Sequence, residues 1–190
     1  MQFDLTTSPD LRKALDDLTT PRDGLTPASP ATDWDAWLEA QIGGMAKVAD
    51  PHTVNLVARC SPDISEANCF LFALRVKPAD IAAYVCGNLV YFGPKFMAHL
   101  EKVRLATKEK AGLNEAQNGD LVIYYRDGKP EHAGTWRAGK VISKWGLGHV
   151  WCHPIGEVPA SYGGTAAIFK RPQRVTQIYQ RWADDHGVGP

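Results

Sequence analysis

Two sequence contexts hold a thiol and an imidazole that could do nucleophilic and acid–base chemistry together. Cys69 follows Asn68, a residue type that often caps helices, and precedes an apolar run. We therefore expect the thiol in the first turn of a short helix, where unpaired N–H groups can lower its pKa and bind an oxyanion. His132 opens a predicted strand, and the small residues Ala133 and Gly134 after it would let another element approach. Neither residue is diagnostic alone, because each also suits a structural position, but the pair in this order is more specific.

The other cysteines do not suggest a scaffold or a metal centre. Cys60 and Cys86 are predicted to be small buried residues, since the cysteine spacings match no paired zinc ribbon and a disulfide framework is not expected in 190 residues. His149, Cys152 and His153 lie close together in sequence, but neighbouring strand residues point to opposite faces. The sequence therefore predicts no metal site, and the expected chemistry requires no cofactor.

The overall charge excludes broad electrostatic capture of polyanions. The chain carries 21 basic and 21 acidic residues, which argues against nucleic-acid or membrane partners. The sequence contains no run of about 18 apolar residues, so no membrane span is predicted. The N-terminus does not resemble a cleavable signal peptide. The expected location is the cytoplasm, or outside the cell after delivery by a non-classical route.

The N-terminal third is expected to be helical. Residues 8–20 begin with Ser8 as a cap and Pro9 in the first turn, while residues 20–30 are rich in proline and predict a loop. A second helix should start near Thr32 or Asp33, bury Trp34, Trp37, Leu38 and Gln41, and either end or weaken at Gly43-Gly44. Residues 1–55 are therefore interpreted as a helical extension with a linker.

The remaining chain changes from helical to strand periodicity near residue 119. Residues 64–111 are expected to be mainly helical, including a helix over 79–89 and an amphipathic stripe at Phe96, Leu100, Val103 and Thr107. Strands are predicted at 121–125, 132–137, 140–145, 150–151 and 165–170, with turns at Asp127-Gly128 and Ala138-Gly139. Helices followed by an antiparallel meander predict an α+β fold, with the core at 56–175 and a C-terminal helix or tail at 176–190.

These motifs resemble the NlpC-type and CHAP-type papain-like cysteine peptidases. The resemblance spans residues 66–172 and is carried by Cys69 on a helix, the segment Gly119–Tyr124, His132-Ala133-Gly134, and the late Ile168–Pro172. It implies a papain-like core, a cysteine nucleophile at Cys69, a histidine base at His132, and cleavage of amide bonds, commonly in peptidoglycan stem peptides.

The third catalytic position departs from that family. Its members usually orient the histidine with His, Asn or Gln on the next strand, whereas here the position falls on or beside Ser143. A serine hydroxyl can accept the imidazole N–H but adds no negative charge. His149 is the alternative orienting residue. The segments around Ser143, His153 and Tyr162 also resemble another group of papain-like bacterial proteins, which implies no substrate.

Three functions follow as expectations. The first is a thiol hydrolase of peptide or amide bonds that acts on a peptide or protein substrate, with peptidoglycan as one candidate. The second is an effector or toxin that modifies a host protein by deamidation, acyl transfer or restricted proteolysis, with an immunity or inhibitor protein as its partner. The third is a catalytically inactive binding module on the same fold.

Overall fold

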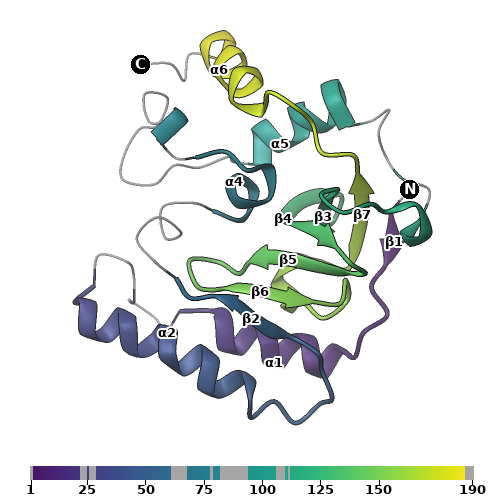
Figure 1. Ribbon diagram of the computed structural model, residues 1–190. Helices are drawn as coiled ribbons and strands as arrows, with labels where there is room; N and C mark the ends of the chain where they lie inside the picture. The colour runs from purple at the N-terminus through teal and green to yellow at the C-terminus, as the bar shows by residue number, and fades with distance from the viewer. Residues whose placement is uncertain are drawn as a thin grey trace.

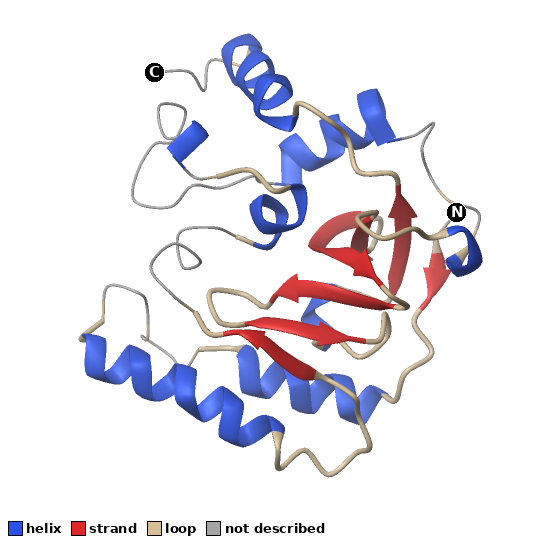
Figure 2. Cartoon of the chain, viewed as in Figure 1, coloured by secondary structure: helices blue, strands red, loops and turns tan. Residues whose placement is uncertain are grey.

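The computed structural model describes residues 2–21, 25, 29–60, 68–77, 79–81, 94–105, 110 and 112–186. Its centre is a seven-stranded antiparallel sheet in the order β1-β7-β3-β4-β5-β6-β2. Helices pack on both sides of this sheet, as Figures 1 and 2 show. The predicted α+β class is confirmed at this level.

The middle of the sheet is the predicted meander. Strands β3 (Leu121–Arg126), β4 (Lys129–Arg137), β5 (Lys140–Lys144) and β6 (Val150–His153) follow one another as antiparallel neighbours, and β7 (Thr165–Phe169) returns beside β3. Both tight turns have two consecutive residues of positive φ, at Asp127-Gly128 and Ala138-Gly139, as the sequence predicts.

Two short edge strands were not predicted. Strand β1 (Phe3–Asp4) pairs with β7, and β2 (Asn55–Ala58) pairs with β6. Their few residues carry no readable alternation, so only their pairing partners define them as strands. Strand β1 lies within residues 1–55, the region interpreted as a helical extension, and β2 begins at the end of that region. The two strands form the two edges of the sheet.

One face of the sheet, called the α4 face here, is covered by three helices. Helices α4 (Cys69–Leu74), α5 (Pro94–Leu100) and α6 (Val175–Asp185) lie together in the upper half of Figure 1. Their buried side chains share one core with alternate strand residues, including Leu121, Ile123, Ala133, Ala167 and Phe169. The α4 face is therefore set by the odd-numbered positions of β3 and β4.

The opposite face, called the α1 face here, is covered by α1 (Pro9–Thr19) and the end of α2 (Ala31–Met45). Leu11, Leu15 and Met45 pack against Trp145 and Trp151. Further along the same face, a second cluster includes Val122, Tyr124, Trp136, Val141 and Ile168. The α1 face therefore holds the other set of alternating strand positions.

The two N-terminal helices match the sequence prediction with one change. Ser8 caps α1 by accepting the N–H of Leu11 at 3.3 Å. Helix α2 buries the predicted face, but it continues through Gly43-Gly44 to Met45. A side chain at Gly44 would collide with Leu18 of α1, so this glycine permits close helix packing instead of ending the helix.

The central helical region is only partly described. The predicted helix over 79–89 lies mainly outside the described residues, as do Cys86 and Thr107. Phe96 and Leu100 of α5 are buried as predicted, but Val103 retains 47% of its surface in the π-helical turn Glu101–Leu105. The wider turn shifts the angular position of residues after Leu100, so the 3.6-residue stripe does not continue through Val103. No helix among the described residues is long and apolar enough to cross a membrane.

Candidate active site

Cys69 is the first residue of α4, as the sequence predicts. Asn68 caps the helix, because its side-chain oxygen accepts the N–H of Leu71 at 3.0 Å. Burial raises the pKa of the Cys69 thiol to about 11, while the N–H of Ala133, the charge of Lys144 and the N–H groups of Phe70 and Cys69 act to lower it. The residue still keeps part of its surface. Cys69 is therefore a protonated thiol at neutral pH that already has groups able to stabilise a thiolate.

Lys144 is the charged residue that counteracts the effect of burial on the pKa of Cys69. It is fully buried on β5, and its ammonium donates to the backbone oxygen of Gly146 at 2.6 Å. Burial lowers the pKa of Lys144 to about 8, and the thiols of Cys60 and Cys69 act in the opposite direction. A lysine with this pKa exchanges its proton near physiological pH, which suits a general base.

His132 lies on the α1 face, whereas Cys69 packs against the core of the α4 face. In the β3–β4 register His132 lies opposite Tyr124, and Ala133 lies opposite Ile123. The backbone N–H of Ala133 is the group of β4 that interacts with the Cys69 thiol. The imidazole stacks on the ring of Tyr162 with centroids 3.8 Å apart, and neither ring nitrogen has a hydrogen-bond partner in the described structure. Burial keeps the pKa of His132 well below its usual value, and His153 and Lys144 lower it further.

Ser143 shares the α1 face with His132 but bonds to other groups. Its hydroxyl oxygen accepts the indole N–H of Trp145 at 2.9 Å. It also lies 2.8 Å from Nε2 of His153, whose Nδ1 lies 2.8 Å from the carbonyl oxygen of Pro154. The arrangement is satisfied if Nδ1 donates to the carbonyl and Nε2 accepts from the hydroxyl, which is a neutral histidine. Burial lowers the pKa of His153 to about 4, consistent with this form.

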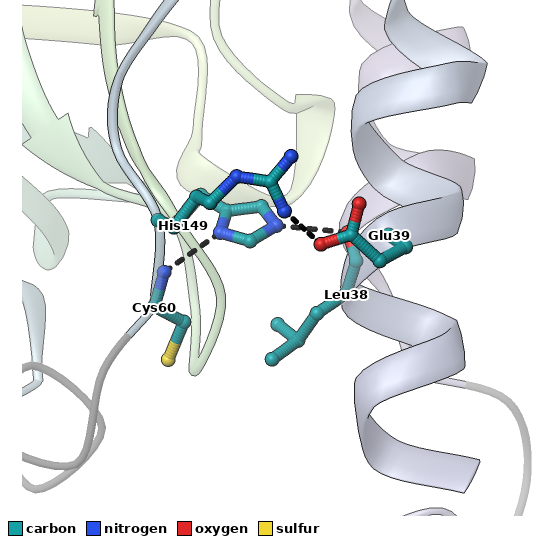
Figure 3. A network of polar contacts seen from close by, with 5 residues as sticks. Leu38, Glu39, Cys60 and His149 are labelled. Carbon is teal, nitrogen blue, oxygen red and sulfur yellow. Dashed lines mark hydrogen bonds and ion pairs between the residues drawn. The ribbon is translucent and has the colours of Figure 1, made fainter. Parts of the chain in front are cut away.

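His149, the alternative orienting residue, connects β6 to α2 instead. Figure 3 shows its ring between the backbone N–H of Cys60, which donates to Nδ1 at 2.8 Å, and the carbonyl oxygen of Leu38, 2.8 Å from Nε2. Beside it, Arg59 pairs with Glu39. Both ring nitrogens are occupied, and burial lowers the pKa of His149. This histidine therefore fastens the chain around Cys60 to the long helix.

The structure thus brings together a different set from the predicted one. Cys69 is not joined to His132, and neither Ser143 nor His149 bonds to the His132 ring. The physical reason is strand alternation. Successive residues of β4 point to opposite faces of the sheet, so His132 points to the α1 face when Ala133 points toward α4. The β4–β5 pairing carries Gly134 against β5, where an added side chain would collide with Val141. The close approach predicted at Gly134 is therefore made by a strand and not by the helix.

Lys144 is the site residue that sequence reasoning missed. The alternation that assigns Ser143 to the face of Val141 and Trp145 also assigns Lys144 to the α4 face. That signal was present in the sequence, but a lysine at a strand end is usually solvated. Only the packing of α4 over β5 shows that this lysine is buried.

The described residues offer no cluster of three metal-ligating side chains. His149 and His153 contact Trp151 and Trp145 on the α1 face, and Cys152 between them occupies the alternate strand position. Comparisons with protein-family models, curated proteins and solved structures found no match to this chain.

Proposed function

We propose that this chain is a thiol-dependent hydrolase of peptide or amide bonds with a papain-like core, in which Cys69 is the nucleophile. The observation that carries the proposal is the position of Cys69 at a capped helix start beside a buried lysine. A helix N-terminus and a nearby cation both favour a thiolate. The arrangement of α4 against an antiparallel meander supports the papain-like assignment.

In the proposed reaction, Lys144 takes the role that the sequence assigned to His132. The neutral amine of Lys144 accepts the thiol proton, and the Cys69 sulfur attacks the carbonyl carbon of the substrate amide. Backbone N–H groups at the start of α4 stabilise the oxyanion. The lysine then returns the proton to the leaving amine, and water hydrolyses the thioester. Ser–Lys dyads provide a chemical precedent for a lysine base.

The same site serves two substrate settings. Cleavage of a cell-wall stem peptide and modification of a host protein both begin with attack of the thiolate on an amide. The two settings share the amide bond and the Cys69 nucleophile, and product analysis by mass spectrometry with muropeptides and candidate proteins distinguishes them.

A second candidate function is a catalytically inactive module that binds peptides. Two observations favour it: burial raises the pKa of the Cys69 thiol to about 11, and the ring nitrogens of the predicted base His132 have no hydrogen-bond partner among the described residues. Under this alternative, Cys69 is a buried helix residue whose thiol does no chemistry.

The test is alkylation of the native protein by a chloroacetamide peptide, followed over pH 6–10 and assigned by peptide mass spectrometry. An active dyad should label Cys69 faster than Cys152, with a rate that rises through pH about 8 as Lys144 loses its proton. Lys144→Met should remove that rise. Labelling of Cys69 that has no inflection near pH 8 and only increases toward pH 10, unchanged in Lys144→Met, would support the inactive module and reject the hydrolase.

A further inference from the structure

A cleft of about 530 Å³ runs beside α4 on the same side of the sheet as Cys69. Apolar side chains form much of its wall, including Phe72 of α4, Ile142 of β5 and Val150 of β6. Val57 of the edge strand β2 also lines it and keeps 49% of its surface exposed. Such a surface suits an apolar side chain of a ligand.

Three arginines line the same cleft, and none of its described lining residues is acidic. They are Arg75, Arg137 and Arg171, and none appears among the ion pairs of the described residues. One terminal nitrogen of Arg171 is buried without a hydrogen-bond partner in the described structure. Burial lowers the pKa of Arg171, and the neighbouring charge of Arg75 adds to this effect. Two adjacent guanidinium groups with no counter-ion among the described residues favour binding of an anion.

The cleft begins close to the proposed nucleophile. Phe72 lies one helical turn after Cys69, a rise of about 5 Å, and Ile142 lies two residues before Lys144, about 7 Å along the strand. Arg75 stands six residues after Cys69, about 9 Å along the axis if the helical rise continues through this C-cap. An extended peptide covers about 3.3 Å per residue, so this distance corresponds to about three residues.

We propose that the cleft binds an acidic peptide, with an Asp or Glu side chain about three residues from the amide that Cys69 attacks. This inference rests on the proposed function for the position of the reacting amide. Guanidinium groups bind carboxylates through paired N–H donors, so Arg171 and Arg75 would hold the acidic side chain while Phe72 and Ile142 contact its apolar neighbour.

Binding is tested separately from catalysis by using the Cys69→Ala protein. Two fluorescein-labelled hexapeptides, acetylated and amidated, differ only in glutamate or glutamine at one position, and fluorescence anisotropy gives their dissociation constants. We expect the glutamate peptide to bind about tenfold more tightly or better, because a hydrogen bond to a charged group is worth more than a neutral one. Arg171→Gln should reduce the preference to near one.

Arg126→Gln is the matched control, because Arg126 is exposed at the end of β3 and does not line the cleft. It should keep the glutamate preference. Arg75→Gln, at an exposed helix end, repeats the test if Arg171→Gln does not fold. Equal binding of the two peptides, or an equal loss of the preference in Arg126→Gln, would overturn the proposal. Because the thiol is absent from this protein, a failed hydrolase assay would leave the result unaffected.

Discussion

The two faces of the sheet differ in the hydrogen bonding and the protonation of their buried polar groups. The α1 face holds His132, Ser143, His149 and His153, and three of these four are neutral groups tied into hydrogen bonds. The α4 face instead holds the buried ammonium of Lys144 near the partly buried thiol of Cys69. Both faces hold groups with shifted pKa values, but those of the α1 face include histidines kept neutral by burial, whereas the α4 face places a lysine near a thiol, and this pair is the basis of the proposed chemistry. His132 is the exception on the α1 face, since its buried ring stacks on Tyr162 but has no hydrogen-bond partner in the part of the chain that the structure describes.

The strongest test of this comparison is Cys69→Ala against Cys152→Ala. If the α4 face carries the nucleophile, Cys69→Ala should lower the rate of amide cleavage by about 10⁴-fold or more. Cys152 lies on β6 and is partly exposed, so its alanine variant should retain activity. Rates come from mass spectrometry of peptide products, with circular dichroism to show that both variants fold. Full activity in Cys69→Ala would remove the site from this face.

The next test separates the two faces directly. Lys144→Met should cost about 10²–10³-fold in rate, within the range for a positioned base. His132→Phe keeps a flat ring against Tyr162 and should change the rate less than about threefold, since a stacked ring needs no proton. If His132→Phe loses most of its activity while Lys144→Met remains active, then His132 is the base, as the sequence predicted. Its ring would then have to turn toward Cys69 during the reaction.

Local signals predicted much of the fold and part of this site. The cap at Asn68, the position of Cys69 and the turns of the meander depend on neighbouring residues, and all were predicted. To predict whether Cys69 meets His132, one must also know which alternate residues of β4 point toward α4. That choice depends on register and on the close approach of Gly134 to β5, which link distant segments. The edge strands β1 and β2 were missed for the same reason.

The buried charge of Lys144 on the α4 face should also make the free energy of unfolding depend on pH. The pKa of Lys144 falls from 10.5 to about 8 on folding, so below pH 8 the folded protein must bury a charge. Between these values the unfolded chain binds more protons than the folded one, and stability therefore rises with pH. Lys144→Met should raise the free energy of unfolding at pH 7 by up to about 3 kcal/mol.

That gain should shrink as the pH rises from 8 toward 10.5, because the wild-type lysine is then neutral in the folded state. Urea unfolding of both proteins at several pH values measures the difference. Cys69 is present in both, so the loss of stability expected from its raised pKa above pH 9 is common to the two proteins to first order. A constant difference across this range would show that Lys144 is not buried as a charge.

On the α1 face, Ser143→Ala should affect stability and not rate. The change leaves the indole N–H of Trp145 and Nε2 of His153 without their shared partner. Two buried polar groups left unpaired should cost about 1–3 kcal/mol. Ser143→Thr is the matched control because it keeps the hydroxyl. Thermal unfolding and the cleavage rate are measured together, and a large rate loss with unchanged stability would place Ser143 in the catalytic machinery.

The smallest test compares one helix cap from each face. Asn68 accepts the N–H of Leu71 at the start of α4, and Ser8 accepts the N–H of Leu11 at the start of α1. Replacing either by alanine should cost about 1 kcal/mol of stability, because one N–H donor at the helix start loses its acceptor. Only Asn68→Ala should also slow alkylation of Cys69, since fraying of the first turn of α4 disorders the N–H groups that favour the thiolate. Asn68→Asp keeps the cap and should restore the stability. If Ser8→Ala slowed the thiol equally, the effect would come from general loosening of the fold, and the special electrostatics assigned to the α4 face would be unnecessary.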